Sequence, residues 1–252
     1  MRTTLVRGGA AAASTVVSVM LITGCTTTGT PVAVDGAGAT STGASSTATP
    51  TGDVAKVKSL ALTAADLPPG FTFTPLPEDQ FRKAVTQSGS FLRDATITPP
   101  ACANLQKLPD VDPAQLGGAV ATAPGGDGLV EGLAARPADI AAARTAATGP
   151  CKNFTIRLNS GPTAGSATAA TSTLLPAPAT RADPQDVLML RQDLKVSTDG
   201  QTVDVVSYSG VASVKGYNVS VVAGPGRPGA TPDDAAFRQF FTAAVNKVAA
   251  QG

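Results

Sequence analysis

The chain has 252 residues, of which 42% are hydrophobic and 15% are charged, and its formal net charge is +1. This near-neutral balance lacks the basic surface that proteins use to bind nucleic acids, so we expect no nucleic-acid partner. The sequence contains no histidine. That absence excludes Ser-His-Asp and Cys-His catalysis, His-ligated zinc and a histidine general base, because each of these requires an imidazole.

The first 24 residues have the layout of a bacterial export signal. Arg2 and Arg7 give a positive start, residues 10–22 form a mostly apolar core, and small residues precede Cys25. The core is too short, and too rich in Ala, Ser and Thr, to span about 30 Å of hydrocarbon as a permanent helix. We therefore predict a cleaved signal peptide over residues 1–24. An ordinary secretory signal that happens to contain a cysteine is the alternative.

The end of this signal, "LITGC" at residues 21–25, resembles the lipobox of bacterial lipoproteins. The resemblance implies that the Cys25 thiol receives a diacylglycerol, that cleavage follows Gly24, and that Cys25 becomes the first residue of the mature chain. One acyl chain binds a membrane only marginally, whereas two or three chains, diacylglycerol plus palmitate, hold it stably. We therefore expect a lipid-anchored protein on the extracytoplasmic side of the cell membrane.

Residues 25–55 follow the predicted cleavage site and consist almost entirely of Thr, Ser, Gly, Ala and Pro. This composition does not bury enough apolar surface to order itself, so we predict a flexible tether. A segment of this length has a root-mean-square reach of roughly 30 Å, which would hold a domain away from the bilayer.

Residues 56–252 suit one domain better than two. Besides Cys25, this chain contains only Cys102 and Cys151, and an exported protein meets an oxidising compartment. The simplest interpretation is a Cys102–Cys151 disulfide. Metal binding by the two cysteines is the alternative, but neither a third soft ligand nor a histidine accompanies them. We therefore expect no metal and no cofactor.

The last third of the chain predicts two consecutive β-hairpins. Residues 186–196 alternate apolar and polar side chains, and a two-residue turn at 199–200 leads into a second strand over residues 202–214. A further two-residue turn follows at 215–216. Pairing across it places six residues on one side of the sheet: Ser209, Val211, Ser213, Asn218, Ser220 and Val222. We expect this serine-rich side to be the wetter face of the sheet and the opposite side to be covered.

The two hairpins disagree about which face is apolar. Strict alternation from the first turn puts Leu194 and Val196 on the same side as the serines of the second hairpin. A β-bulge inserts one residue and switches the faces. We therefore predict a bulge at Val205-Val206.

Two helices are legible in the second half of the chain. Residues 137–148 predict one, and the C-terminal segment predicts another, with Thr231 as its N-cap and Pro232 at its first position. The C-terminal helix carries one apolar stripe, which we expect to pack into the core rather than face a ligand: Phe237, Phe240, Phe241, Ala244, Val245 and Val248.

Further strands are expected over residues 127–136, 152–158 and 164–177. Runs of hairpins with helices at either end predict an α+β fold. We expect an antiparallel sheet of about five to six strands, with helices packed on one face and one disulfide.

Several of these features together resemble a known group of proteins. They are "LTAADLPPGFTF" at residues 62–73, the Cys102 and Cys151 pair, the helix leading into "CKNFTI", the hairpins and the closing helix. They resemble small mycobacterial and related actinobacterial lipoproteins, and they are similar in layout to the extracellular sensor domain of PknH-type receptor kinases. The resemblance implies a sheet packed by helices, with a cleft that binds an unidentified ligand. Two disulfides are typical of that sensor, whereas this chain offers one pair.

The sequence therefore predicts a non-catalytic, lipid-anchored protein of the cell envelope. Its domain would bind a small apolar or cell-wall ligand, such as a lipid, or an envelope protein partner. One alternative is an envelope spacer that presents the serine-rich strand face to another protein. The other is a carboxylate-based hydrolase, which would need two facing carboxylates with one desolvated in a cavity.

Overall fold

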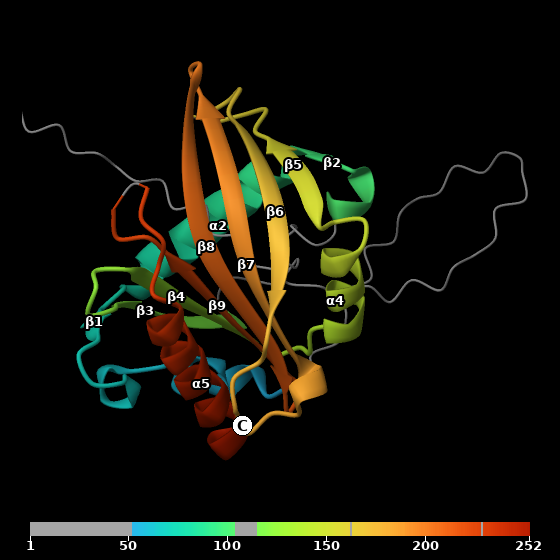
Figure 1. The fold of residues 1–252 in the computed structure, drawn as a ribbon. Coiled ribbons are helices and arrows are strands. Elements are labelled where there is room, and N and C mark those ends of the chain that lie inside the picture. Colours follow the sequence, from blue (N-terminus) through green and yellow to red (C-terminus); the bar gives the residue numbers. More distant parts are fainter. Residues whose placement is uncertain (1–51, 104–114, 162, 228) are drawn as a thin grey trace, which may run out of the picture.

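The computed structural model describes residues 52–252, except residues 104–114, 162 and 228. Cys25, the predicted signal peptide and most of the predicted tether lie outside the described residues. The described part is α+β and contains one nine-stranded antiparallel sheet, with the strand order β1-β3-β4-β9-β8-β7-β6-β5-β2 (Figure 1). The expected number of five to six strands was too low, because the sheet also contains the strand Leu116–Thr122 and a three-residue strand at each edge.

The helices and strands have the following bounds. The helices are α1 (Val57–Leu60), α2 (Glu78–Arg93), α4 (Ile140–Thr148) and α5 (Asp234–Gln251). The first strands are β1 (Thr72–Thr74), β2 (Thr96–Thr98), β3 (Leu116–Thr122), β4 (Gly128–Ala134) and β5 (Asn153–Arg157). The remaining strands are β6 (Ala167–Leu175), β7 (Val187–Thr198), β8 (Gln201–Val214) and β9 (Tyr217–Gly224).

Both predicted hairpin turns are confirmed. Thr198 pairs with Gln201 across the first turn, and Val214 pairs with Tyr217 across the second. Each turn has a positive φ at both central residues, 52° and 78° in the first and 49° and 84° in the second. These angles require a residue that tolerates the left-handed region, and a glycine stands second in each turn.

The predicted bulge at Val205-Val206 is wrong. Leu194 pairs with Val205 and Asp193 with Val206, so the register of β7 and β8 is regular through this point. No switch of faces is needed, because near the first turn the face that carries Leu194 is packed, whereas the opposite face carries the exposed Lys195 and Asp204. Leu194 and Val196, near the first turn, therefore lie on the same face as Ser209 and Ser220, which are nearer the second turn.

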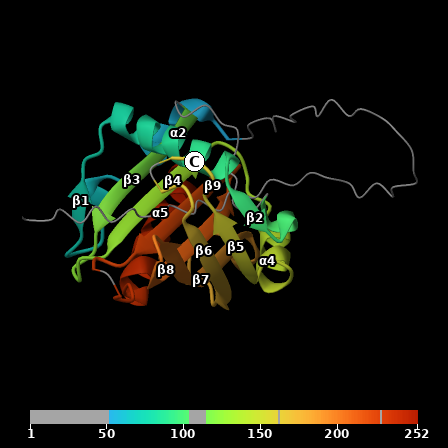
Figure 2. The same ribbon diagram turned by 90° about the horizontal axis from the view of Figure 1, so that it is seen from above.

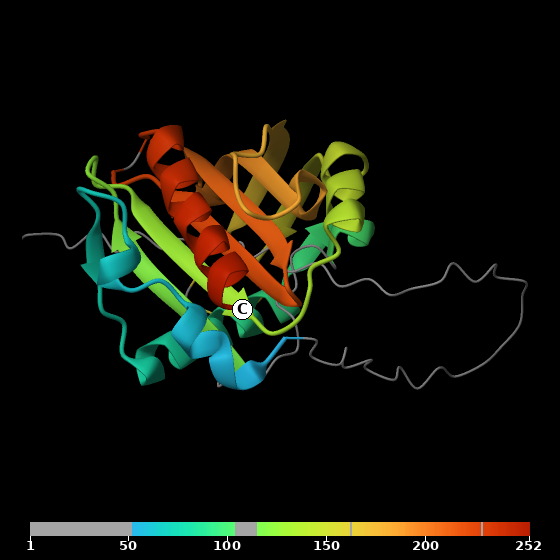
Figure 3. The ribbon, with the colours of Figure 1, turned by 90° about the horizontal axis from the view of Figure 1, so that it is seen from below.

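One face of the sheet packs against α5, and we call it the α5 face (Figure 3). All six predicted apolar residues of α5 are fully buried, which confirms their role in the core. The helix lies so close to β8 that a Cβ at Gly210 would come within 2.7 Å of the Phe241 ring. Helix α1 packs against the β3 and β4 end of the same core, through Val57 and Leu60.

The opposite face, which we call the α4 face, is also covered. Helix α4 packs on Leu188, Leu190 and Val211. Helix α2 lies on the other side of β3 and β4 from α5 (Figure 2), and a Cβ at Gly118 would come within 2.8 Å of the Phe81 ring. The prediction of helices on one face was therefore wrong.

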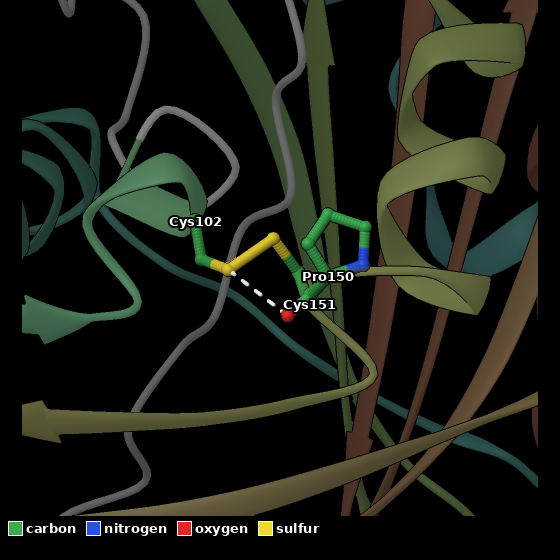
Figure 4. Close-up of a disulfide and its surroundings, with 3 residues drawn as sticks. All are labelled: Cys102, Pro150 and Cys151. Atoms are coloured by element: carbon green, nitrogen blue, oxygen red, sulfur yellow. Dashed lines mark hydrogen bonds between the residues drawn. A yellow bond between two sulfur atoms is a disulfide. The ribbon is translucent and has the colours of Figure 1, made fainter.

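The Cys102–Cys151 disulfide, as predicted, completes the cover of the α4 face (Figure 4). The two Cα atoms are 5.5 Å apart, and the Cys102 Sγ lies 3.8 Å from the carbonyl oxygen of Pro150. The bridge packs into an apolar cluster with residues of β2, β5, β6 and β7: Ile97, Phe154, Ile156, Ala170 and Leu194.

Both predicted helices exist, but each begins later than expected. Helix α5 begins at Asp234, and its N-cap is Asp233 rather than Thr231. The side chain of Asp127 accepts a hydrogen bond from the Asp233 N–H at 2.7 Å and so fixes this start. Helix α4 begins at Ile140 rather than residue 137, with Asp139 as the capping side chain.

Candidate functional site

A row of buried polar side chains crosses the α4 face of the sheet. We call it the polar stripe, and it consists of Ser172, Gln192, Ser207, Ser209, Ser220 and Asn218. All six are at most 8% exposed, although serine, asparagine and glutamine ordinarily lie at the surface. The structure therefore buries the serine-rich face that the sequence predicted to be the wetter one.

The strand register makes the polar stripe a diagonal across β6 to β9. Gln192 lies opposite Ser172 on one side and Ser207 on the other. Ser209 follows two residues further along β8, on the same face. Ser220 and Asn218 continue the line on β9, where Asn218 pairs with Ser213. The six side chains thus form one continuous feature rather than scattered polar positions.

Two atoms of the polar stripe have no hydrogen-bond partner. They are the Ser209 Oγ and the Asn218 Oδ1, which are both buried. By contrast, the Ser220 Oγ donates a hydrogen bond to the carbonyl oxygen of Gly132 at 3.0 Å. A buried polar atom without a partner costs about 1–3 kcal/mol, so folding alone gives no reason to place a hydroxyl at position 209. An external group that bonds to these atoms would remove that cost.

The α4 face of the sheet is free of charge on the described strands. Every charged strand residue lies on the α5 face instead, as the pairing register shows: Glu131, Arg157, Arg191, Asp193, Lys195 and Asp204. The helices that cover the α4 face do not turn charges toward it either. The charged residues of α2 are exposed, and Arg144 of α4 donates to the backbone carbonyls of Gln185 and Val187. Among the described strands, a group that contacts the polar stripe thus meets only neutral side chains.

An apolar shelf continues from the polar stripe toward the edge of the sheet. It is the cross-strand row of Val222, Val130 and Val120, which pair with one another beside Ser209. All three valines are half-buried, unlike the neighbouring core residues. Helix α2 covers this side, and its Phe81 is also half-buried. An incompletely enclosed apolar row of the α4 face therefore adjoins its unpartnered hydroxyl.

A second polar cluster lies on the α5 face, around Glu131 of β4. Glu131 is fully buried, and its Oε2 accepts a hydrogen bond from the Leu62 N–H at 2.8 Å. Its Oε1 has no partner. On α5, the Lys247 Nζ donates to the carbonyl oxygen of Ala61 at 2.6 Å and to Asp66 Oδ2 at 2.8 Å. Together these contacts clamp residues 61–66 between β4 and α5.

The two carboxylates of this clamp have pKa values that shift in opposite directions. Burial raises the pKa of Glu131 to about 7, against the lowering effects of the Leu62 N–H and Lys247. Partial burial also acts to raise the pKa of Asp66, but hydrogen bonds from Lys247 and Thr63 hold it below its ordinary value. A neutral Glu131 beside an ionised Asp66 is the combination that a general acid and a base would need. Both carboxylates, however, accept hydrogen bonds from backbone N–H groups of residues 61–66, so they hold this segment in place.

The predicted site residues and Tyr217 have the following outcomes. Cys102 and Cys151 are brought together as the disulfide, whereas Cys25 lies outside the described residues. Tyr217 is buried, and its hydroxyl exchanges hydrogen bonds with the backbone N–H and carbonyl of Asp53. It holds the start of the folded domain against β9.

No group of three or more His, Cys, Asp or Glu side chains that could hold a metal ion occurs in the described part of the chain. Among the described helices, none is both long and apolar enough to cross a membrane.

Comparisons with known proteins give a family but no activity. No curated protein matches the chain. A crystal structure of an uncharacterised protein from Mycobacterium smegmatis is similar, with 19% identity, a TM-score of 0.39, and coverage of 79% of this chain and 98% of the other. The model of the family described as a domain of unknown function, DUF5642, matches residues 53–249. The chain therefore belongs to the DUF5642 family.

Proposed function

We propose that this protein is a lipid-anchored binding domain of the cell envelope, without catalytic activity, and that its ligand contacts the polar stripe. Cys25 would carry the acyl chains on the extracytoplasmic side of the membrane, and residues 25–55 would tether the domain. The disulfide is compatible with that location, because such bonds persist in oxidising compartments.

The observation that carries the binding proposal is the pair of buried atoms without partners, the Ser209 Oγ and the Asn218 Oδ1. They lie on a face where the neighbouring Ser220 hydroxyl is satisfied by the protein itself. Binding sites combine apolar walls with a few polar groups that fix the orientation of the ligand. The polar stripe and the adjoining valine shelf provide both components on one face.

The two alternative functions lack comparable support. The spacer hypothesis required direct contact between the serine-rich face and the surface of another protein, but α2 and α4 lie over that face. The hydrolase hypothesis required a desolvated carboxylate in a cavity with a second one facing it. Glu131 is desolvated, but it and Asp66 bond to the Leu62 and Thr63 backbone of the clamped segment.

Native mass spectrometry of the full-length protein, purified from an actinobacterial membrane, tests this proposal. We expect a chain that begins at Cys25 with added acyl mass, and a fraction that carries one further small molecule. Changing Ser209→Ala together with Asn218→Leu should remove the small molecule and leave the acyl mass unchanged. Ser197→Ala is the control, because this serine lies on the opposite face and bonds Thr202 at the surface.

Two results would contradict the proposal. An unmodified N-terminus would reject the membrane anchor. A protein that carries no small molecule, or one that the double variant retains at the level of the wild type, would reject the binding site.

A further inference from the structure

We propose that the ligand of the polar stripe is an uncharged amphiphile, with hydroxyl groups that bond to the stripe and an aliphatic part that lies on the valine shelf. This inference rests on the function proposed above, and it adds the chemical class of the ligand.

The absence of charge follows from the sheet itself. The described strands carry six charged residues, and all six lie on the α5 face. A charged ligand group on the α4 face would lose its hydration without gaining a counter-charge, which is strongly unfavourable. A carboxylate, phosphate or ammonium group is therefore a poor match for the polar stripe.

The hydroxyl groups follow from the kind of side chain that lines the stripe. A serine hydroxyl both donates and accepts, while the free Asn218 atom is an acceptor. A hydroxyl group of the ligand can donate to Asn218 Oδ1 and can exchange a hydrogen bond with Ser209 Oγ. The two atoms are not neighbours, because Asn218 pairs with Ser213, which lies four residues along β8 from Ser209, a spacing of about 13 Å. One sugar ring beside the valine shelf therefore bonds to Ser209, and only a longer polyol or oligosaccharide also reaches Asn218.

The aliphatic part follows from the order of residues along one cross-strand row. Ser209 is followed by Val222, Val130 and Val120, with no polar residue between them. The three valines retain partial exposure beneath α2, so an apolar ligand group that covers them would gain hydrophobic free energy. A purely polar sugar would leave the three valines partly exposed, whereas the alkyl chain of an alkyl glycoside would cover them.

Octyl glucoside is a suitable probe, because it joins a neutral sugar to a short alkyl chain. We would titrate it, below its micelle concentration, into the isotopically labelled domain and follow the backbone amide signals by NMR. The expected changes fall on residues of β8 and β9 that border the polar stripe. Octyl sulfate and octyltrimethylammonium test the effect of charge with the same chain. Glucose alone separates recognition of a free sugar from recognition of a lipid-linked one.

We expect Ser209→Ala to weaken octyl glucoside binding about tenfold, because it removes one buried hydrogen bond to the ligand. Asn218→Leu should bind this probe like the wild type, because a sugar ring bonded to Ser209 does not reach a residue four strand positions away. Ser197→Ala should bind the probe like the wild type. The Ser209→Ala domain should remain folded, since its lost hydroxyl has no partner in the protein.

Several outcomes would overturn the inference. Equal binding of octyl sulfate or octyltrimethylammonium would reject an uncharged ligand, and equal binding of glucose would reject the aliphatic part. If octyl glucoside does not bind, or if it shifts the signals of residues away from the polar stripe, an uncharged amphiphile is rejected as the ligand. These failures differ from failure of the proposed function: a charged molecule that co-purifies and is lost in the double variant would leave the site in place and reject only the class.

Discussion

Replacing both Cys102 and Cys151 with alanine is expected to lower the free energy of unfolding by about 4 kcal/mol, the cost that the chain-entropy relation gives for opening a loop of this length. The two cysteines are 49 residues apart, and the loop that they close includes β3, β4 and α4. Urea denaturation followed by circular dichroism would measure the change. Alanine keeps the site apolar, which suits two positions that are buried in an apolar cluster.

The wild-type protein with its disulfide reduced provides the control for this experiment. It should unfold at nearly the same urea concentration as the double variant, because both lack the cross-link. A double variant within about 1 kcal/mol of the oxidised wild type would show that the bridge adds little to stability.

The second large effect concerns Glu131, whose replacement by glutamine should change how stability depends on pH. The folded-state pKa of Glu131 is raised to about 7 from a reference value of 4.5, because burial disfavours the charged form. As the pH rises between these values, the unfolded chain releases this proton while the folded chain keeps it. Stability is therefore lost with increasing pH, by about 3 kcal/mol in total. Glu131→Gln should abolish this contribution.

The measurement is the free energy of unfolding of both proteins across this pH range. The difference between Glu131→Gln and the wild type should be small near pH 4.5 and should grow in favour of the variant until about pH 7. Glu78→Gln is the matched control, because Glu78 is an exposed residue that pairs with Lys58 at the surface. A difference that stays constant with pH would show that Glu131 titrates normally in the fold.

This pH dependence has a local counterpart in the clamp on residues 61–66. Ionised Glu131 would keep its bond from the Leu62 N–H, but it would bury a charge whose Oε1 has no partner. Lys247 on α5 and the ionised Asp66 are the charges that act on it. Deprotonation of Glu131 therefore destabilises the packing of residues 61–66 against β4.

The sequence predicted the hairpins and the C-terminal helix correctly because their signals are local. A two-residue turn with glycine second requires positive φ angles, which few residues adopt, so turn and register follow from a short stretch of chain. The stripe of Phe237, Phe240 and Phe241 repeats with the period of a helix. These features need no information about the rest of the fold.

The cover of the sheet could not be predicted in the same way. Helix α2 carries the sequence "TQSGS" in its second half, which reads as a loop by composition. If this segment is taken as a loop, fewer helices are available to cover the α4 face. The sequence then favours a solvent-exposed serine-rich face. The mistaken bulge has the same origin, since it was invoked to keep one face polar.

The two polar clusters left different signals in the sequence. Glu131 alternates with Leu129 and Leu133, and this pattern places a charged residue among core positions of one strand. A charged residue at such a position indicates a buried carboxylate. The polar stripe is different: the pairing of Ser209, Ser220 and Asn218 on one side of the sheet was predicted, but their burial depends on α2 and α4. Only tertiary structure shows that Ser209 lacks a partner.

The most direct test of the proposed binding site is a crystal structure of the protein purified from its native cells with any molecule that co-purifies. We expect ligand atoms within hydrogen-bond distance of Ser209 Oγ and Asn218 Oδ1, with an aliphatic portion against Val222 and Val130. A ligand bound elsewhere, or a Ser209 hydroxyl that bonds to another protein group instead, would contradict it.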